Sequence, residues 1–96
     1  MTKHSLKINP VYFDAVKNGI KTFEIRKNDR DYRVGDTISL GEWVPGTIEA
    51  GSWTGRRVKV AITYILTHDD FSDGISEGYV ILGIKVIPQI MTDNVI

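Results

Sequence analysis

The stretch GIKTFEIRKNDRDYRVGD, residues 19–36, decides how the chain folds and where its function is sought. Its first half alternates with a period of two, which predicts a strand. The apolar Phe23 and Ile25 share one face of this strand, and the charged Glu24 and Arg26 share the other. Because an unpaired charge is costly to remove from water, the charged face is either a solvated edge or a functional site.

The segment before this strand predicts a shorter strand and a helix. Residues 4–8 alternate in polarity, and Asn9 followed by Pro10 is a helix start, since asparagine accepts from free N–H groups and proline needs no donor in the first turn. Gly19 predicts the helix end. A helix of roughly nine residues is too short to be stable alone, so it must pack on a sheet. Its apolar spacing predicts a buried side made of Tyr12, Ala15 and Val16.

The rest of the chain predicts three more strands, at residues 37–43, 56–66 and 79–87. A loop or hairpin excursion is expected at 44–55 and an acidic loop at 67–78, whereas the tail at 88–96 has no readable pattern. The last strand is apolar on both faces, as is typical of a central strand. These features predict an α+β, mostly β fold, a small and mostly antiparallel β-barrel of about five strands with one short helix after the first strand. An open sheet with the helix on one face is the alternative.

One domain is expected over residues 1–96, with its core at about 4–87. The chain of 96 residues is 42% hydrophobic and 25% charged, which suits a single small domain. Twelve Lys and Arg balance twelve Asp and Glu, so the total charge does not indicate a polyanionic partner. Basic residues nevertheless gather at 26–33 and 56–59, and acidic ones at 69–77. The sequence leaves open whether the two basic groups adjoin in space.

The composition excludes several classes of chemistry. The chain has no cysteine, which excludes disulfides, thiolate catalysis and zinc sites built on cysteine. Its start lacks the apolar segment of a secretion signal, and no run approaches the roughly 20 apolar residues of a membrane span. The acidic stretch after His68 matches the spacing of neither a zinc site nor an EF-hand. We therefore expect a cytoplasmic protein that has no metal, no other cofactor and no membrane partner.

The segment GIKTFEIR resembles the G-x-K-x-x-E-x-R signature of the ASCH domain of the PUA-like superfamily. The surrounding order agrees: a strand, an NP-initiated helix, the signature, then VGD, GEW, WTG and GYVILGI. Over residues 4–87 the chain is similar to a branch of small uncharacterised ASCH-like proteins of bacteria and their phages. This resemblance implies a PUA-like β-barrel with a pocket beside the helix. It also implies RNA or a modified nucleotide or nucleoside as the partner.

A second function follows from the same resemblance. Some bacterial ASCH proteins are amidohydrolases that act on acetylated cytidine with a Lys, a Thr and a Glu. Lys21 matches the lysine, but Glu24 stands at the position that corresponds to the threonine, and a carboxylate cannot take over the chemistry of a hydroxyl unchanged. Glu77 or the acidic residues 69–73 are candidates for the assisting carboxylate. The alternative is therefore an amidohydrolase of an acylated nucleoside such as N4-acetylcytidine, with Lys21, Glu24 and Glu77 as catalytic residues, and whether the chain is an enzyme stays open.

The main candidate for nucleotide binding is the set Lys21, Glu24 and Arg26. Arg26 offers planar donors to a phosphate or a base edge, and Glu24 can accept from an amino group of a base. The alternative is an ion pair on a solvated face, which contributes little. Arg57 and Lys59 share a face of a later strand and extend the site if that face continues the surface of Arg26.

Three further features complete the set of candidates. Trp53 in the 44–55 loop is the best candidate for stacking on a base, whereas Trp43 and Tyr79 end strands and are expected in the core. Residues 27–33 alternate in charge and are interpreted as a salt-bridged loop, with a phosphate-binding strip as the alternative. A protein-interaction module is the third functional class, and a contiguous exposed apolar patch would indicate it. The oligomeric state is left open.

Overall fold

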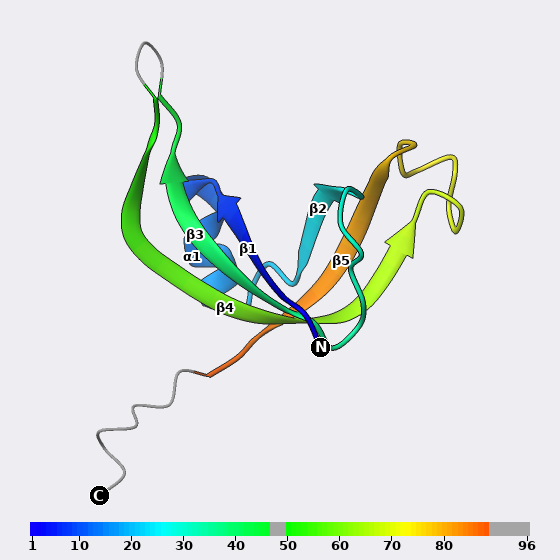
Figure 1. The fold of residues 1–96 in the computed structure, drawn as a ribbon, viewed down its shortest axis with the longest axis horizontal. Coiled ribbons are helices and arrows are strands. Elements are labelled where there is room, and N and C mark those ends of the chain that lie inside the picture. Colours follow the sequence, from blue (N-terminus) through cyan, green and yellow to red (C-terminus); the bar gives the residue numbers. More distant parts are fainter. Residues whose placement is uncertain (47–49, 89–96) are drawn as a thin grey trace, which may run out of the picture.

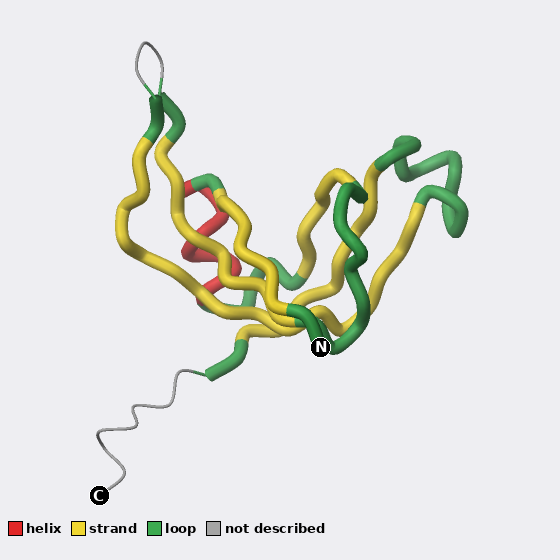
Figure 2. The backbone as a smooth tube through the Cα atoms, in the orientation of Figure 1, coloured by secondary structure: helices red, strands yellow, loops and turns green. Residues whose placement is uncertain are grey.

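A computed structural model describes residues 1–46 and 50–88 (Figures 1 and 2). It contains six elements, namely β1 (Lys3–Ile8), α1 (Pro10–Lys17), β2 (Phe23–Lys27), β3 (Thr37–Val44), β4 (Ser52–Thr67) and β5 (Tyr79–Val86). The predicted class is confirmed, because the fold is mostly β with one short helix after the first strand. In the described part of the chain, no helix is long and apolar enough to span a membrane.

The five strands form one sheet in the order β1-β3-β4-β5-β2. β1 pairs with β3 in parallel, and the other three pairs are antiparallel. Figure 1 shows the sheet curling into a half-barrel, with β1 and β3 on one side and β2 and β5 on the other. β4 makes this shape possible, because it pairs first with β3 and then with β5 and has an irregular register between Ile62 and Tyr64. β5 lies between β4 and β2, so its prediction as a central strand is confirmed.

Inward side chains of both sides of the half-barrel meet in one core. Its buried members are Leu6, Ile8, Phe13, Val16, Tyr32, Ile38, Leu40, Val58, Val60, Ile62, Val80, Leu82 and Ile84. The start of α1 is as predicted, since the side chain of Asn9 accepts from the N–H of Val11 at 3.0 Å and Pro10 occupies the first turn. Gly19 follows the helix with φ of 74°. The predicted buried side was wrong for Tyr12, which is exposed, because the helix turns Phe13 and Val16 toward the sheet.

Asp36 joins the start of β1 to the turn before β3. Its carboxylate accepts from the ring N–H of His4 at 2.9 Å, from the backbone N–H of Thr2 at 3.0 Å and from that of Arg33 at 3.0 Å. The hydrogen bond from His4, followed by that from Thr2, lowers the pKa of Asp36 to about 2. The ring of Tyr32 lies against His4, with centroids 4.9 Å apart. This buried cluster fixes the turn that carries the chain from the 28–33 segment into β3.

Replacing Asp36 by asparagine is expected to make the free energy of unfolding less dependent on pH in the acid range. The native pKa lies below the ordinary 3.8, so folding favours the ionised carboxylate. Its contribution is present above about pH 4 and is lost as the pH falls toward about 2. Thermal unfolding between about pH 6 and 2 measures this slope. The exposed Asp31, changed to asparagine, is the control and should leave the slope unchanged; an Asp36→Asn protein as acid-sensitive as the parent would contradict the assignment.

Candidate functional site

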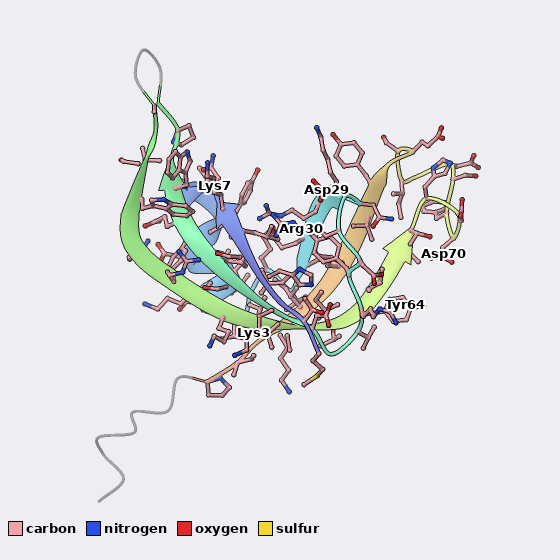
Figure 3. The ribbon with its side chains drawn as sticks, viewed as in Figure 1. Lys3, Lys7, Asp29, Arg30, Tyr64 and Asp70 are labelled. Atoms are coloured by element: carbon pink, nitrogen blue, oxygen red, sulfur yellow. The ribbon has the colours of Figure 1, made fainter. Side chains whose placement is uncertain are left out.

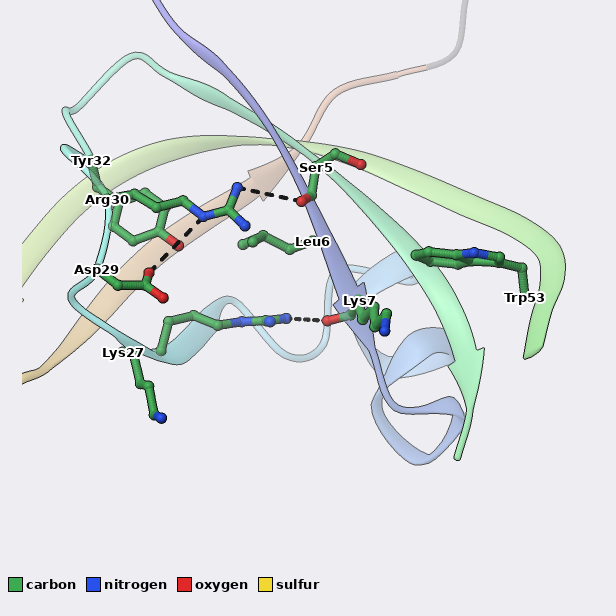
Figure 4. Close-up of a pocket in the computed structure, with 9 residues that line it drawn as sticks. Ser5, Leu6, Lys7, Lys27, Asp29, Arg30, Tyr32 and Trp53 are labelled. Carbon is green, nitrogen blue, oxygen red and sulfur yellow. Dashed lines mark hydrogen bonds and ion pairs between the residues drawn. The ribbon is translucent and has the colours of Figure 1, made fainter. Parts of the chain in front are cut away.

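The two edge strands, β1 and β2, face each other across a seam that arginine side chains bridge. Because β1 pairs with β3 on one side only, the carbonyls of Ser5 and Lys7 point away from that partner. Arg26 Nη2 donates to the Lys7 carbonyl at 2.6 Å, and Arg30 Nη1 donates to that of Ser5 at 3.5 Å (Figure 4). The guanidinium groups of Arg26 and Arg30 therefore take the place of a neighbouring strand at this edge of β1.

Glu24 is the centre of the charged face of β2. It is 4% exposed. Lys21 Nζ lies 2.6 Å from Glu24 Oε1, and Arg26 approaches Glu24 Oε2 with Nη2 at 2.8 Å and Nε at 3.0 Å. The predicted alternation of β2 is confirmed, with Phe23 and Ile25 on the exposed outer face. The ion pairs of the alternative interpretation are present, but the face that carries them is not solvated, because it points into the half-barrel.

A cleft of about 460 Å³ runs along the seam. Its lining residues are Ser5, Leu6, Lys7, Arg26, Lys27, Asp29, Arg30, Tyr32 and Trp53. In Figure 4, Trp53 lies at one end of this seam cleft, Lys27, Asp29 and Arg30 lie at the other, and β1 runs between them. Figure 3 likewise places Lys7 across from Asp29 and Arg30. The lining holds four cationic side chains and a single acid, so the seam cleft is basic although the chain as a whole is neutral.

Trp53 forms an aromatic platform at one end of the seam cleft. It lies in β4, so its prediction as a loop residue was wrong, because the strands of the hairpin extend to Val44 and Ser52. Trp53 is 50% exposed, and its ring packs edge-on against Trp43 with centroids 4.9 Å apart. A Cβ on Gly41 would come within 2.6 Å of the Trp53 ring and of an Arg57 nitrogen, so glycine is required for both side chains to cross the backbone here. Trp43 is half-buried and lies outside the core cluster, so its prediction as a core residue was wrong.

The two basic groups of the sequence meet at Ser5. Arg57 donates to the hydroxyl of Ser5 at 2.9 Å and to that of Ser39 at 2.8 Å, while Arg30 approaches the Ser5 carbonyl. Lys59 pairs with Ser39 in the register of β3 and β4 and so shares this face, but it is not part of the cleft lining. The structure thus brings Arg57 next to the seam cleft and leaves Lys59 farther along the same face.

Arg56 belongs to a different network on the opposite face of β4. Its guanidinium donates to both oxygens of Glu42, at 2.9 and 2.8 Å, and to Asp14 at 3.0 Å. Thr54 donates to Glu42 at 2.7 Å, and the hydrogen bonds from Arg56 and then Thr54 lower the pKa of Glu42 to about 2. This network ties α1 to β3 and β4. A single glutamate inside the strand-like TISLGEW was the available sequence signal for a buried ion pair.

A second cleft, of about 380 Å³, lies beside the helix on the other side of Glu24. Its lining residues are Tyr12, Lys21, Phe23, Glu24 and Ile25. Lys21 and Arg26 therefore both pair with Glu24, but the three residues line two different clefts. Arg26 lines the seam cleft, while Lys21 and Glu24 line this helix-side cleft.

Glu77 is not brought to Lys21 and Glu24. It lies in a separate cleft of about 190 Å³ with Asn28, whose N–H donates to the Gly78 carbonyl at the far end of β2. Glu24 and Asn28 are four residues apart along the chain, which corresponds to roughly 13 Å at about 3.3 Å per residue of a strand. The predicted catalytic set of Lys21, Glu24 and Glu77 is therefore not assembled in this structure.

The outer face of β2 is apolar. Phe23 and Ile25 are exposed there, and Ile25 also lines a cleft of about 290 Å³ with Ile75, Tyr79 and Ile81. Tyr79 is exposed, so its prediction as a core residue was wrong; it ends β5 on this outer face. This face is the surface that a protein-interaction module would use.

Sequence reasoning missed the contribution of β1 to the site. Ser5 and Lys7 lie on the polar side of the alternating KHSLKI, and that alternation was the only signal for them. The salt-bridged loop was confirmed by Arg33 with Asp31 at 3.1 Å and Arg30 with Asp29 at 4.0 Å. The same loop nevertheless supplies Arg30 and Asp29 to the seam cleft.

The chain matches one protein family and is similar to a phage protein. The family described as "Domain of unknown function (DUF3850)" matches residues 3–84. A protein of Escherichia phage P2, described as "Uncharacterized 12.9 kDa protein in GpA 3'region", is 44% identical over 79 residues, which cover 82% of this chain and 64% of that protein. The chain thus spans less than two thirds of this relative.

A solved structure has a similar fold. The "Crystal structure of hypothetical protein PH0355" matches with a TM-score of 0.60 and 16% identity over 90% of this chain and 100% of that one. At this identity the likeness concerns the fold alone. None of the three descriptions names an activity, a ligand or the ASCH domain, so the ASCH resemblance stays a prediction.

Proposed function

The chain belongs to the DUF3850 family, whose description assigns no activity, and we propose that it binds RNA or a modified nucleotide in the seam cleft. The observation that carries this proposal is the composition of the cleft, where an exposed tryptophan lies at one end and cationic side chains at the other. A nucleotide has the same two parts, a flat base and an anionic phosphate. Aromatic side chains stack on unpaired bases, and guanidinium groups bind phosphate through paired hydrogen bonds.

The guanidinium of Arg26 is fixed by contacts within the chain, in an orientation that suits phosphate binding. Nε and Nη2 are fixed by Glu24, and Nη2 also by the Lys7 carbonyl. Nη1 has no hydrogen-bond partner among the described residues and belongs to a side chain that lines the seam cleft. A donor fixed in this way loses little conformational freedom on binding, which favours affinity.

A nucleotide ligand agrees with the resemblance of residues 19–26 to the signature of the ASCH domain. We propose that the family is an ASCH-like branch of the PUA-like superfamily, because the segment GIKTFEIR places Lys21 and Arg26 on the carboxylate of Glu24, beside the helix. The basic seam cleft next to this carboxylate supports a nucleotide-binding role for the signature.

Replacing Trp53 by alanine is expected to weaken binding of a short single-stranded RNA about 5- to 150-fold, which corresponds to about 1–3 kcal/mol for one stacked base. Fluorescence anisotropy of a labelled oligonucleotide of about eight nucleotides measures the affinity. Trp53→Phe keeps an aromatic ring and should retain most of it. Lys85→Ala is the matched control, because Lys85 is exposed on β5 and does not line the cleft. Equal affinity of the Trp53→Ala and Lys85→Ala proteins would contradict the proposed site.

Hydrolysis of an acylated nucleoside is the second candidate, and one contact favours it. Lys21 Nζ lies 2.6 Å from Glu24 Oε1, and both residues line the helix-side cleft. Against it, Glu24 already accepts from Lys21 and Arg26, and Lys21 also donates to the Phe23 carbonyl at 2.6 Å. Incubation with N4-acetylcytidine decides the question: release of cytidine that Lys21→Ala abolishes establishes the hydrolase, and no release removes it.

A further inference from the structure

We infer that the ligand of the seam cleft is a single strand with at least two phosphates, which lie in succession along β1 at Arg26 and Arg30. The inference rests on the proposed function and narrows it, because it excludes a free nucleoside and a duplex as the preferred ligand. It follows from where the two arginines are anchored, from the distance between their anchors, and from the position of Trp53.

The arginines are anchored on carbonyls of one strand. Arg26 donates to Lys7 and Arg30 to Ser5, both on the edge of β1 that faces the seam. A guanidinium has five N–H donors, so each group can hold its anchor and still bind an anion. Arg30 is the less constrained of the two, since its contacts are long, 3.5 Å to Ser5 and 4.0 Å to Asp29. Two separate cationic positions therefore lie along β1.

The spacing of the anchors suits consecutive phosphates. Ser5 and Lys7 are two residues apart in one strand, which corresponds to roughly 7 Å. Phosphates of a stacked duplex strand advance by roughly 3.4 Å along the axis, and an extended strand separates them further. An extended dinucleotide with two phosphates can place one phosphate at each position. The second position therefore contributes only when the ligand has a second phosphate.

The position of Trp53 selects an unpaired strand. Its exposed ring can stack only on a base whose face is free, and bases inside a duplex are covered on both faces by their neighbours. Lys7 lies between this ring and Arg30 in Figure 4, and its Nζ is 3.9 Å from the centre of the Trp43 ring. Lys7 is thus placed to contact the backbone between the stacked base and the phosphates.

The test compares adenosine 5′-monophosphate with pApA, a dinucleotide that carries two phosphates, and with a short RNA duplex. Quenching of tryptophan fluorescence measures each affinity. We expect pApA to bind about tenfold more tightly than the monophosphate, as one more charge-assisted contact would give. Between about 50 and 200 mM salt, the logarithmic slope of affinity should be steeper for pApA by about 0.7.

Arg30→Ala is the variant that isolates the second position, because Arg30 is partly exposed and takes no part in the Glu24 network. It should remove the advantage of pApA over the monophosphate, and Lys85→Ala should change neither affinity. Equal affinity for the two nucleotides overturns this inference while the proposed function stands. Equal binding of the duplex also overturns it. Binding of none of the three removes both proposals.

Discussion

Phe13→Ala is expected to lower the free energy of unfolding by about 3–5 kcal/mol, the usual cost of removing a buried aromatic side chain. Phe13 is 1% exposed and belongs to the core cluster that joins α1 to the sheet. Its ring also supports the Arg56 guanidinium, which lies 4.3 Å from the ring centre and holds Glu42. A cavity at this point therefore removes apolar contacts and loosens the ion pair that ties the helix to β3 and β4.

Tyr12→Ala is the matched control, because the neighbouring Tyr12 is 50% exposed on the same helix. It should cost less than about 1 kcal/mol. Denaturant unfolding of both proteins gives the two free energies. For a domain of this size, about 4–8 °C of melting temperature is expected for each kcal/mol, so Phe13→Ala should also melt much earlier. Equal costs for the two variants would show that the buried side of α1 has been assigned wrongly.

The helix illustrates what local sequence can and cannot predict. Its start and end were readable, because Asn9, Pro10 and Gly19 act through the few backbone groups beside them. Its buried side was not, since Tyr12 and Phe13 are both aromatic and neighbouring residues lie only about 100° apart around a helix. The sheet decides which of the two is buried, and the sheet is assembled from distant strands.

The charged face of β2 illustrates the same limit. Alternation placed Glu24 and Arg26 together, but a period of two does not say which face points inward. The answer depends on the curl of the sheet, which brings the β1 edge and the β2 edge to one seam. Only then do the Lys7 carbonyl and Arg26 meet. The site was therefore half predictable, since its β2 residues carry a signature and its β1 residues only an alternation.

Trp53 was assigned to a loop for a local reason that proved insufficient. Gly46, Gly51 and Gly55 surround it in sequence, and such a density of glycine is typical of turns. The two strands nevertheless continue into this region and pair Trp43 with Trp53. Cross-strand packing of two aromatic rings can stabilise a hairpin over local turn preference. The functional interpretation of Trp53 as an exposed stacking residue does not depend on this correction, because the ring remains half exposed.

Glu24→Ala is expected to weaken both the fold and the binding of nucleotides. Lys21 and Arg26 would lose the carboxylate between them, and removing one member of a buried ion pair usually costs about 3–5 kcal/mol. The side chains of these cations are 17% and 22% exposed, so water compensates part of the loss. We therefore expect a decrease of about 2–4 kcal/mol in the free energy of unfolding. Glu24→Gln keeps an acceptor without the charge and should lose less.

The effect on binding separates a positioning role from simple electrostatics. Glu24 does not line the seam cleft, but it fixes Nε and Nη2 of Arg26, which does. Without it Arg26 is free to move, so affinity for a single-stranded oligonucleotide should fall about tenfold, although a negative charge has been removed. Asp29→Ala is the matched control and should strengthen binding, because exposed Asp29 lines the seam cleft and its carboxylate repels phosphate. Affinity measured well below the melting temperature decides: if Glu24→Ala strengthens binding as Asp29→Ala does, Glu24 does not position Arg26.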